Sequence, residues 1–390
     1  MKVQKILIGG WFQRTTLHLS EIYDFLKEAK SPLDFDKKKL KELKDSLNLR
    51  GVDMKVDNLE HIDVSSSDGL SYKIYEDGLI IFSTRSQHID RSLTKLTSYY
   101  EEKLGPALSY IFSLGAPVPK ELASIKNIYP YFVILDKSKE KDIKDLFKEF
   151  GQKKYFEIKQ ESFEIYRGNK FYIINNIDEK LKSIEKFIEE QVFFREFKGQ
   201  LHRYLNLHRI IWEKIDEVKE RGKIRGTEIA GFKEKLESYK KTINLIEARI
   251  EQMGAYIGTR ASILLNNKEL ENFQGVDQFK HEKLTNTLGY VKVIWQMTKN
   301  YVDSGLKIFD DLAAQSTGKS INDLAVITSM GVGASLIRLF TGQPPTFTWS
   351  GVIYFLVLAA IGYTVNKTMK LIYQRRDYTV SDVKIAKNIK

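Results

Sequence analysis

Six polar or charged side chains lie in or beside an otherwise apolar stretch near the C-terminal end of the sequence. They are Asn322, Asp323, Thr328, Ser329, Ser335 and Arg338. Asn322 and Ser329 are seven residues apart, so a helix would carry both on one face. Thr328 and Ser335 repeat this spacing. Either stripe, facing a shared axis, predicts a hydrated ion path. The alternative is close helix packing, in which small polar residues are common.

Asp323 is the candidate metal ligand of this group, because it is the single acidic residue of the stretch. Carboxylate and water oxygens suit hard cations such as Mg²⁺ and Ca²⁺. Copies of Asp323 gathered around one axis would raise one another's proton affinity unless a cation lay between them. In the competing interpretation Ser320 begins a helix and Asp323 completes a variant of the capping box. Arg338, at the opposite end, would repel cations if it faced the axis.

Two apolar segments must position these residues. The first, 324–337, is followed by the uncharged link 341–346, which contains Pro344 and Pro345. The second, 347–365, has no charged side chain, and a helix of that length spans about 28 Å. A bilayer has a hydrocarbon core about 30 Å thick. Residues 321–366 are therefore predicted to form a two-helix transmembrane hairpin.

Charge predicts the orientation and partner of this hairpin. The tail 367–390 carries seven basic and two acidic residues, whereas the link carries none. The positive-inside rule then places both termini in the cytoplasm, in a multi-pass protein of the inner (cytoplasmic) membrane. The formal net charge of +11 favours the anionic lipid bilayer as partner. Nucleic acid is not expected, because the lysines are interleaved with acidic residues rather than clustered.

Residues 1–177 are predicted to form a cytoplasmic domain of the α+β class with a mixed sheet. Strands are expected at 5–9, 131–135 and 171–174, and Asp77-Gly78 lies between two β-rich runs as a hairpin turn. Helices alternate with these strands, and at least two hairpins are expected. The chain lacks cysteine, which excludes disulfides and thiolate metal sites.

Long helices are predicted after this domain, because there is no proline between Pro130 and Pro344. Apolar residues recur at alternating steps of three and four over 194–218 and 229–257, which predicts a helical hairpin with a heptad seam at 178–275. His208 falls in this seam, where a polar residue can fix register. A third seam over 284–312 predicts a stalk helix at 276–320, roughly 66 Å long from Asp277.

No enzymatic motif is intact. The run Ser316-Thr-Gly-Lys-Ser320 matches the end of a phosphate-binding loop, but position 313 is Ala where the pattern needs Gly. No HExxH zinc motif, Gly-rich nucleotide fingerprint or Ser-His-Asp arrangement is visible. We therefore expect no catalytic activity and no bound cofactor other than a cation.

The order of these parts resembles the CorA family of divalent-cation channels. In that family a cytoplasmic mixed α/β domain, a helical hairpin, a long stalk helix, two membrane helices and a basic tail follow one another. The resemblance implies a homopentamer and Mg²⁺ or another divalent cation as the ion. The Gly-Met-Asn motif of that family is absent; its place reads Leu339-Phe-Thr-Gly-Gln343. The alternative is a membrane-anchored coiled-coil scaffold or sensor without transport activity.

Overall fold

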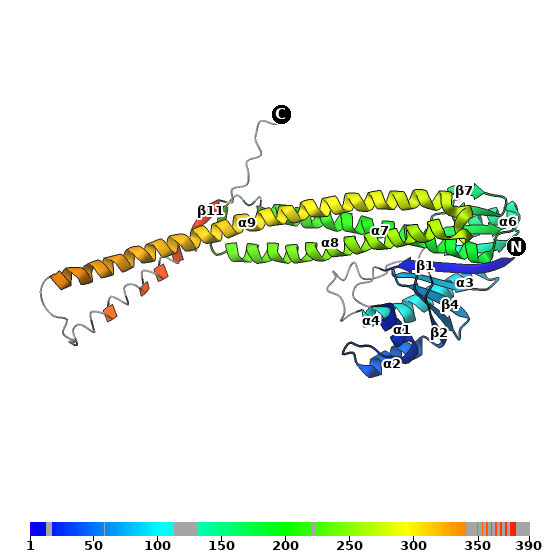
Figure 1. Ribbon diagram of the computed structural model, residues 1–390, viewed down its shortest axis with the longest axis horizontal. Helices are drawn as coiled ribbons and strands as arrows, with labels where there is room; N and C mark the ends of the chain where they lie inside the picture. The colour runs from blue at the N-terminus through cyan, green and yellow to red at the C-terminus, as the bar shows by residue number, and fades with distance from the viewer. Residues whose placement is uncertain are drawn as a thin grey trace, which may run out of the picture. The chain divides into compact units, whose positions relative to one another are not determined.

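The computed structural model divides the chain into two compact units. It describes residues 1–12, 18–57, 59–112, 131–219, 221, 223–340, 349, 353, 356–357, 360, 363–364, 367–368, 371–372 and 375–379, without the side chains of 268–269, 276, 315–327 and 329–340. The first unit combines Met1–Asn206 with Leu245–Val293, and the second combines Leu207–Asn244 with Ile294–Lys390. The three longest helices contribute residues to both units (Figure 1).

The elements follow one another in an order that mixes strands and helices. They are β1 (Val3–Trp11), α1 (Leu19–Glu28), α2 (Lys37–Ser46), β2 (Leu49–Lys55), β3 (His61–Ser66), β4 (Leu70–Tyr75), β5 (Leu79–Thr84), α3 (Ile89–Tyr99), the π-helix η1 (Tyr100–Leu104), α4 (Gly105–Ile111), β6 (Tyr131–Asp136), α6 (Glu140–Glu149), β7 (Phe156–Lys159), β8 (Phe163–Arg167), β9 (Phe171–Asn176), α7 (Leu181–Lys219), β10 (Lys223–Arg225), α8 (Ile229–Asn266), the 3₁₀ helix η2 (Lys268–Phe273), α9 (Gln274–Phe340) and β11 (Asp377–Thr379).

The first unit is built on a nine-stranded sheet of order β2-β3-β4-β5-β1-β6-β9-β8-β7. Only β6 and β9 pair in parallel, so the prediction of a mixed sheet is confirmed. The hairpin predicted at Asp77-Gly78 joins β4 to β5. Gly78 has φ of 92°, which suits glycine, and Asp77 Oδ1 accepts a hydrogen bond from Leu79 N–H at 3.1 Å.

Strands β2 and β3 were not predicted from the sequence. β2 reads Leu-Arg-Gly-Val-Asp-Met-Lys and lies at the sheet edge, where none of its residues is fully buried. An edge strand that buries little surface carries no clear alternation of apolar and polar residues. This edge forms one wall of a pocket in the first unit, whose other wall comes from α7 and α8.

Helices cover both faces of the sheet. One face packs against α1, α2, α3, α4 and α6 in a single apolar cluster that includes Ile6 and Ile8. The opposite face packs against α7, where the Trp11 ring lies 5.3 Å from that of Phe197. Gly9 allows this approach, because a Cβ there would come within 2.7 Å of Ile81 Cδ1 and 3.0 Å of Val192 Cγ1.

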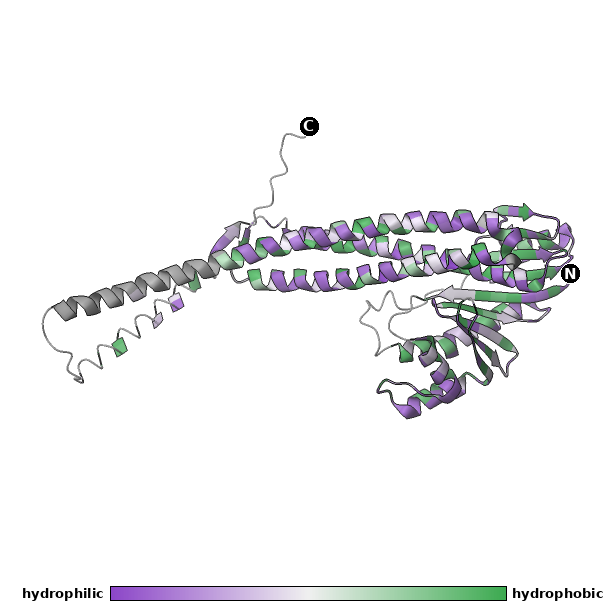
Figure 2. Cartoon of the chain, in the orientation of Figure 1, coloured by the Kyte–Doolittle hydropathy of each residue, from purple (hydrophilic) through white to green (hydrophobic). Residues whose placement is uncertain are grey.

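The predicted heptad seams are confirmed. Along α7 and α8 they bury Phe197, Leu201, Tyr204, Ile215, Leu236, Ile243, Ile246, Ile250 and Met253, and along α9 they bury Leu284, Leu288, Val291, Trp295, Thr298, Val302 and Phe309. The colouring of Figure 2 shows the resulting alternation of hydrophobic and hydrophilic residues along α8 and the first part of α9.

One local prediction is wrong. Ser320 does not cap a new helix, because α9 runs without a break from Gln274 to Phe340. Gly318 also lies within this helix. An N-cap needs a non-helical backbone that leaves the next amides unpaired, and a continuous helix offers none.

Candidate functional site

The six residues predicted to line an ion path all lie in the helical backbone of α9. They are Asn322, Asp323, Thr328, Ser329, Ser335 and Arg338. Thr328 is exposed, and the side chains of the other five lie outside the described residues. The stripes and the cation ligand therefore stay predictions. Within the described part of the chain, no group of His, Cys, Asp and Glu could hold a metal ion.

The predicted membrane hairpin is described only in part. The link 341–346 and most of 347–365 lie outside the described residues. In the part of the chain that the structure describes, no helix combines the length and apolarity that crossing a bilayer requires.

A buried ionic cluster joins the start of α9 to the rest of the first unit. At its centre the Arg260 guanidinium of α8 donates through Nε to Asp77 and through Nη1 to Glu190 Oε1, the latter at 2.6 Å. The guanidinium also lies over the rings of Tyr75 and Phe193, 5.6 and 4.5 Å from their centroids. Arg260 thus connects the β4–β5 turn to α7 and α8.

Pairing keeps this cluster charged despite its burial. Burial opposes the charge on Arg260, but the two carboxylates outweigh it and raise the pKa of the guanidinium. Burial likewise opposes the charge on Glu190, but Arg260 and His281 outweigh it and lower the pKa of that carboxyl. His281 Nε2, on α9, lies 3.5 Å from Glu190 Oε2. The pairing thus extends from Arg260 to α9.

Asp277, in the first turn of α9, is the second buried acid of the cluster. Its Oδ1 accepts a hydrogen bond from Gln191 Nε2 at 2.7 Å. Burial raises the pKa of Asp277 to about 7, although Lys280 partly offsets the effect. Burial also lowers the pKa of Lys280, which donates to Gln191 Oε1. Asp277 therefore changes charge near neutral pH.

Sequence reasoning missed this cluster, although a signal was present. Arg260 continues the α8 seam three residues after Ile257, and Asp277 and His281 precede the α9 seam that resumes at Leu284. Charged residues at positions that a heptad reserves for apolar side chains indicate burial with a partner. The partner of Arg260, Asp77, however, lies 183 residues before it in the chain.

The opposite side of α9 in the first unit carries exposed apolar side chains. Phe279, Tyr290 and Val293 have exposed fractions of 66, 60 and 59 %. Eleven and three residues separate them, so they share one face of the helix. This outer stripe is distinct from the buried seam of Leu284, Leu288 and Val291.

In the second unit, the chain after α9 returns to the turn between α7 and α8. β11 pairs antiparallel with β10, with Tyr378 opposite Ile224, and both side chains are buried. Gly226 N–H adds a hydrogen bond to Arg376 O at 3.1 Å.

Comparison with known proteins identifies no family. No protein-family profile matches the chain, and neither does any curated protein. Among solved structures, the chain is similar to the complete CorA magnesium transporter from Methanocaldococcus jannaschii, with 11% identity, 65% of this chain and 92% of that chain covered, and a TM-score of 0.32. The soluble domain of CorA from the same organism gives 13% identity, coverage of 46% and 86%, and a TM-score of 0.25.

Proposed function

We propose that this chain is a CorA-like membrane protein that self-associates, as a pentamer, into a path for divalent cations. Residues 321–366 form its membrane hairpin, and both termini lie on the cytoplasmic side. The main support for the proposal is that the chain comes back to the α7–α8 turn after α9, where β11 pairs with β10.

The return implies a projecting hairpin. Phe309 of α9 lies at the level of this turn, since its ring is 6.0 Å from that of Phe232, over which Arg221 of the turn is placed. From Phe309, α9 continues to Phe340, which is about 46 Å of helix. By Asp377 the chain is back beside the turn. Helix α9 therefore extends past the turn by more than the thickness of a bilayer's hydrocarbon core, which is about 30 Å.

The apolar side chains of this segment support burial in lipid. Of the described residues, Trp349, Ile353, Leu356, Val357 and Tyr363 are 50–85 % exposed in the single chain. Large apolar side chains that are this exposed mark a membrane or protein contact. The basic tail that follows favours the anionic cytoplasmic leaflet.

The outer stripe of α9 supports self-association. Phe279, Tyr290 and Val293 give every copy of the chain the same exposed apolar surface on its longest helix. Homo-oligomers close most readily through cyclic symmetry, which would gather the α9 helices around one axis. One two-helix hairpin cannot enclose a pore, so an ion path requires several copies. The resemblance to CorA supplies the number five and the divalent ion.

The proposed roles follow from position on α9. Asp323 would concentrate divalent cations at the inner mouth, in a ring of one carboxylate per copy. Asn322, Thr328, Ser329 and Ser335 would hydrate the path. Arg338 would lie at the outer mouth, where Arg338→Ala raises cation flux if the side chain faces the axis.

A second function, a membrane-anchored scaffold or sensor, is favoured by one specific observation. The Gly-Met-Asn motif of the CorA family is absent, and Leu339-Phe-Thr-Gly-Gln343 stands in its place. In this alternative the hairpin only anchors the chain, and the stripe on α9 joins copies without a pore.

Two measurements separate these functions. Native mass spectrometry of the detergent-purified chain should give five copies, and a monomer would contradict both. Liposome flux assays should show divalent uptake that Asp323→Asn reduces and that Asp311→Asn, a control at an exposed acid of the same helix, leaves unchanged. Oligomers without flux would establish the scaffold. A reporter at residue 390 that reads as extracytoplasmic would refute the hairpin.

A further inference from the structure

The two-stranded sheet of the second unit joins the chain after α9 to the turn between α7 and α8. Each strand has three residues, Lys223–Arg225 in β10 and Asp377–Thr379 in β11. Ile224 and Tyr378 lie opposite each other, and only 1 and 6 % of their surfaces are exposed. Opposed residues of an antiparallel pair share one face of the sheet, so this face is the buried one.

The α7–α8 turn is itself attached to α9. At the end of α7, Lys219 is buried, and its ammonium group lies 3.7 Å from the centroid of the Tyr301 ring. The stem of Lys219 packs against Gly305, where an added Cβ would lie 3.6 Å from Lys219 Cδ. After the turn, the ring of Phe232 lies 6.0 Å from that of Phe309. The turn and α9 thus form one body, to which β11 attaches the returning chain.

This attachment is short and includes an unfavourable contact. A two-stranded ribbon is only marginally stable in water unless its side chains pack against another element. The hydroxyl group of Tyr378 is buried and has no hydrogen-bond partner among the described residues. Burying an unpaired hydroxyl carries a free-energy cost, which contact with water removes. Detachment of β11 therefore regains part of the free energy that it loses, and this sheet can open while the long helices stay folded.

We propose that the β10–β11 sheet is a releasable clasp, which opens as a unit and frees the chain leading into β11 from α7 and α9. When the clasp is closed, α9 at Phe309 and the returning chain at Asp377 belong to one body. When it is open, the returning chain moves relative to α9.

The link to conduction rests on the proposed function, whereas the clasp itself does not. A cation path lined by α9 changes its width when the two arms of the hairpin move relative to each other. A closed clasp prevents that movement at the level of the α7–α8 turn. Conduction therefore requires the clasp to open.

Hydrogen exchange of the full detergent-purified chain, measured by mass spectrometry, tests the opening. Peptides from β10 and β11 should exchange together, more slowly than unprotected amides and faster than the centre of α8 around Ile243. Tyr378→Ala should speed exchange in β10 at least about tenfold and leave α8 unchanged. Tyr378→Phe, which lacks the unpaired hydroxyl, should slow it. Exchange in β10 as slow as in α8 would overturn the clasp, and so would a β10 that does not respond to Tyr378→Ala.

A disulfide across the sheet tests the link to conduction, because the chain has no cysteine of its own. Gly226 N–H donates to Arg376 O, so the next pair, Arg225 and Asp377, is a non-hydrogen-bonded pair. The Cα atoms of such a pair are about 4.5 Å apart, which a disulfide can bridge. Both side chains are exposed, so Arg225→Cys with Asp377→Cys leaves the buried face unchanged.

The oxidised double variant should show at least about fivefold less divalent flux in liposomes than the same preparation after reduction. Lys223→Cys with Asp377→Cys is the matched control: its cysteines are diagonal neighbours, roughly 7–8 Å apart, and should form little disulfide and conduct equally in both conditions. Full flux through the crosslinked chain would overturn the link to conduction. Absence of flux in the wild type would instead refute the proposed function, and hydrogen exchange would then decide the clasp alone.

Discussion

Helix α9 is held in two different ways in the two units. In the first unit, Asp277 and His281 meet the buried polar groups Gln191 and Glu190 of α7. In the second unit, the buried contacts of α9 are mostly aromatic and apolar: the rings of Tyr301 and Trp212 stack with centroids 4.3 Å apart, and the Tyr301 hydroxyl donates to Asp216 Oδ1. Ion pairs there, such as Lys233–Asp310 at 2.7 Å, lie at the exposed rim. Buried ionic contacts depend on direction and pairing, whereas apolar contacts tolerate small shifts.

The difference indicates a division of roles along one helix. Removing one partner of a buried ion pair leaves the other charge buried without a counter-ion. This lowers the free energy of unfolding much more than removing an exposed ion pair does. The buried cluster therefore specifies which residues of α7, α8 and α9 meet, and the apolar seam supplies stability over the rest of the length. The following substitutions test this division.

The largest effect is expected for Arg260→Met. It leaves Asp77 and Glu190 buried without their cation, which costs about 3–5 kcal/mol of unfolding free energy. Urea denaturation measures it. In the triple variant with Asp77→Asn and Glu190→Gln much of the loss should return, because no uncompensated charge remains. A triple variant as unstable as Arg260→Met would show that Arg260 acts by packing alone.

A cavity in the apolar seam of the second unit should lower the free energy of unfolding somewhat less than Arg260→Met does. Ile243 is fully buried, and Ile243→Ala should lower the free energy of unfolding by about 2–5 kcal/mol, depending on how far the helices relax. The same urea titration measures it. Ile210→Ala, at an exposed position on α7, is the control and should change little. Ile243→Asp should lower the free energy of unfolding more than Ile243→Ala does, since it buries an unpaired charge. Equal stability of wild type and Ile243→Asp would mean that this face is solvated.

A pH dependence is expected from Asp277. Its pKa in the folded chain is about 7, above the unfolded value of 3.8, so the folded state holds a proton that the unfolded state releases. Stability from this group is therefore full below about pH 4 and is lost as pH rises toward 7. Asp277→Asn should flatten the stability–pH curve between these values. Lys280, Glu190 and His281 face Asp277 within the cluster and remain in that variant. An unchanged curve would assign the dependence to them.

The smallest effect is expected at the rim of the second unit. Lys233→Ala breaks the exposed pair with Asp310 and should lower the melting temperature only slightly, and by less still in high salt. Thermal melts at low and high salt measure it. A loss as large as that of Arg260→Met would remove the contrast between the two units.

The sequence predicted the parts that depend on local periodicity. The seams over 194–218, 229–257 and 284–312 follow from steps of three and four, and the Asp77-Gly78 turn follows from a two-residue signal. Strand β2 escaped prediction because an edge buries too little surface to impose alternation. Strand β3 was missed although it is largely buried. The capping role of Ser320 was wrong because a capping motif cannot report that a longer helix already spans it.

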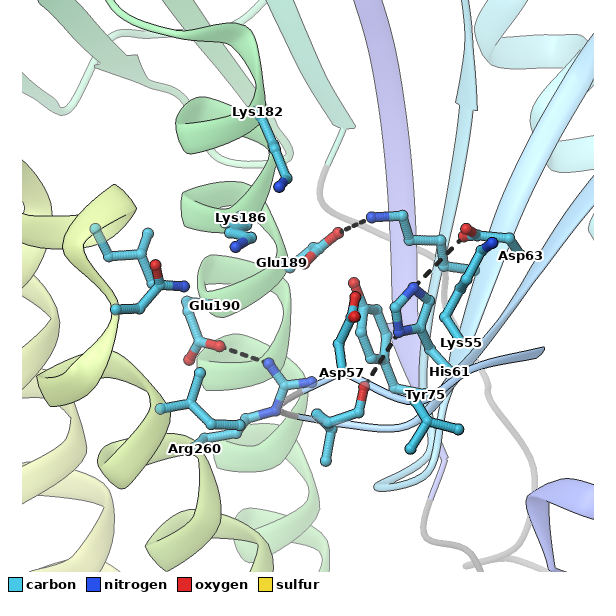
Figure 3. Close-up of a pocket in the computed structure, with 16 residues that line it drawn as sticks. Lys55, Asp57, His61, Asp63, Tyr75, Lys182, Lys186, Glu189, Glu190 and Arg260 are labelled. Carbon is cyan, nitrogen blue, oxygen red and sulfur yellow. Dashed lines mark hydrogen bonds and ion pairs between the residues drawn. The ribbon is translucent and has the colours of Figure 1, made fainter. Parts of the chain in front are cut away.

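What the sequence determined by itself is the presence of the long helices, their buried faces and the uncharged segment at 347–365, because each is a property of neighbouring residues. Only the tertiary structure decided the partners. Asp77 meets Arg260, and Ile224 meets Tyr378, across separations that no local pattern encodes. The pocket between the sheet edge and α7 arises in the same way. Its lysines, Lys55 and Lys73 of the sheet and Lys182 and Lys186 of α7, come together only when the sheet packs on the helices (Figure 3). A pairing between distant residues is selected by the burial of both, and that burial exists only in the folded chain.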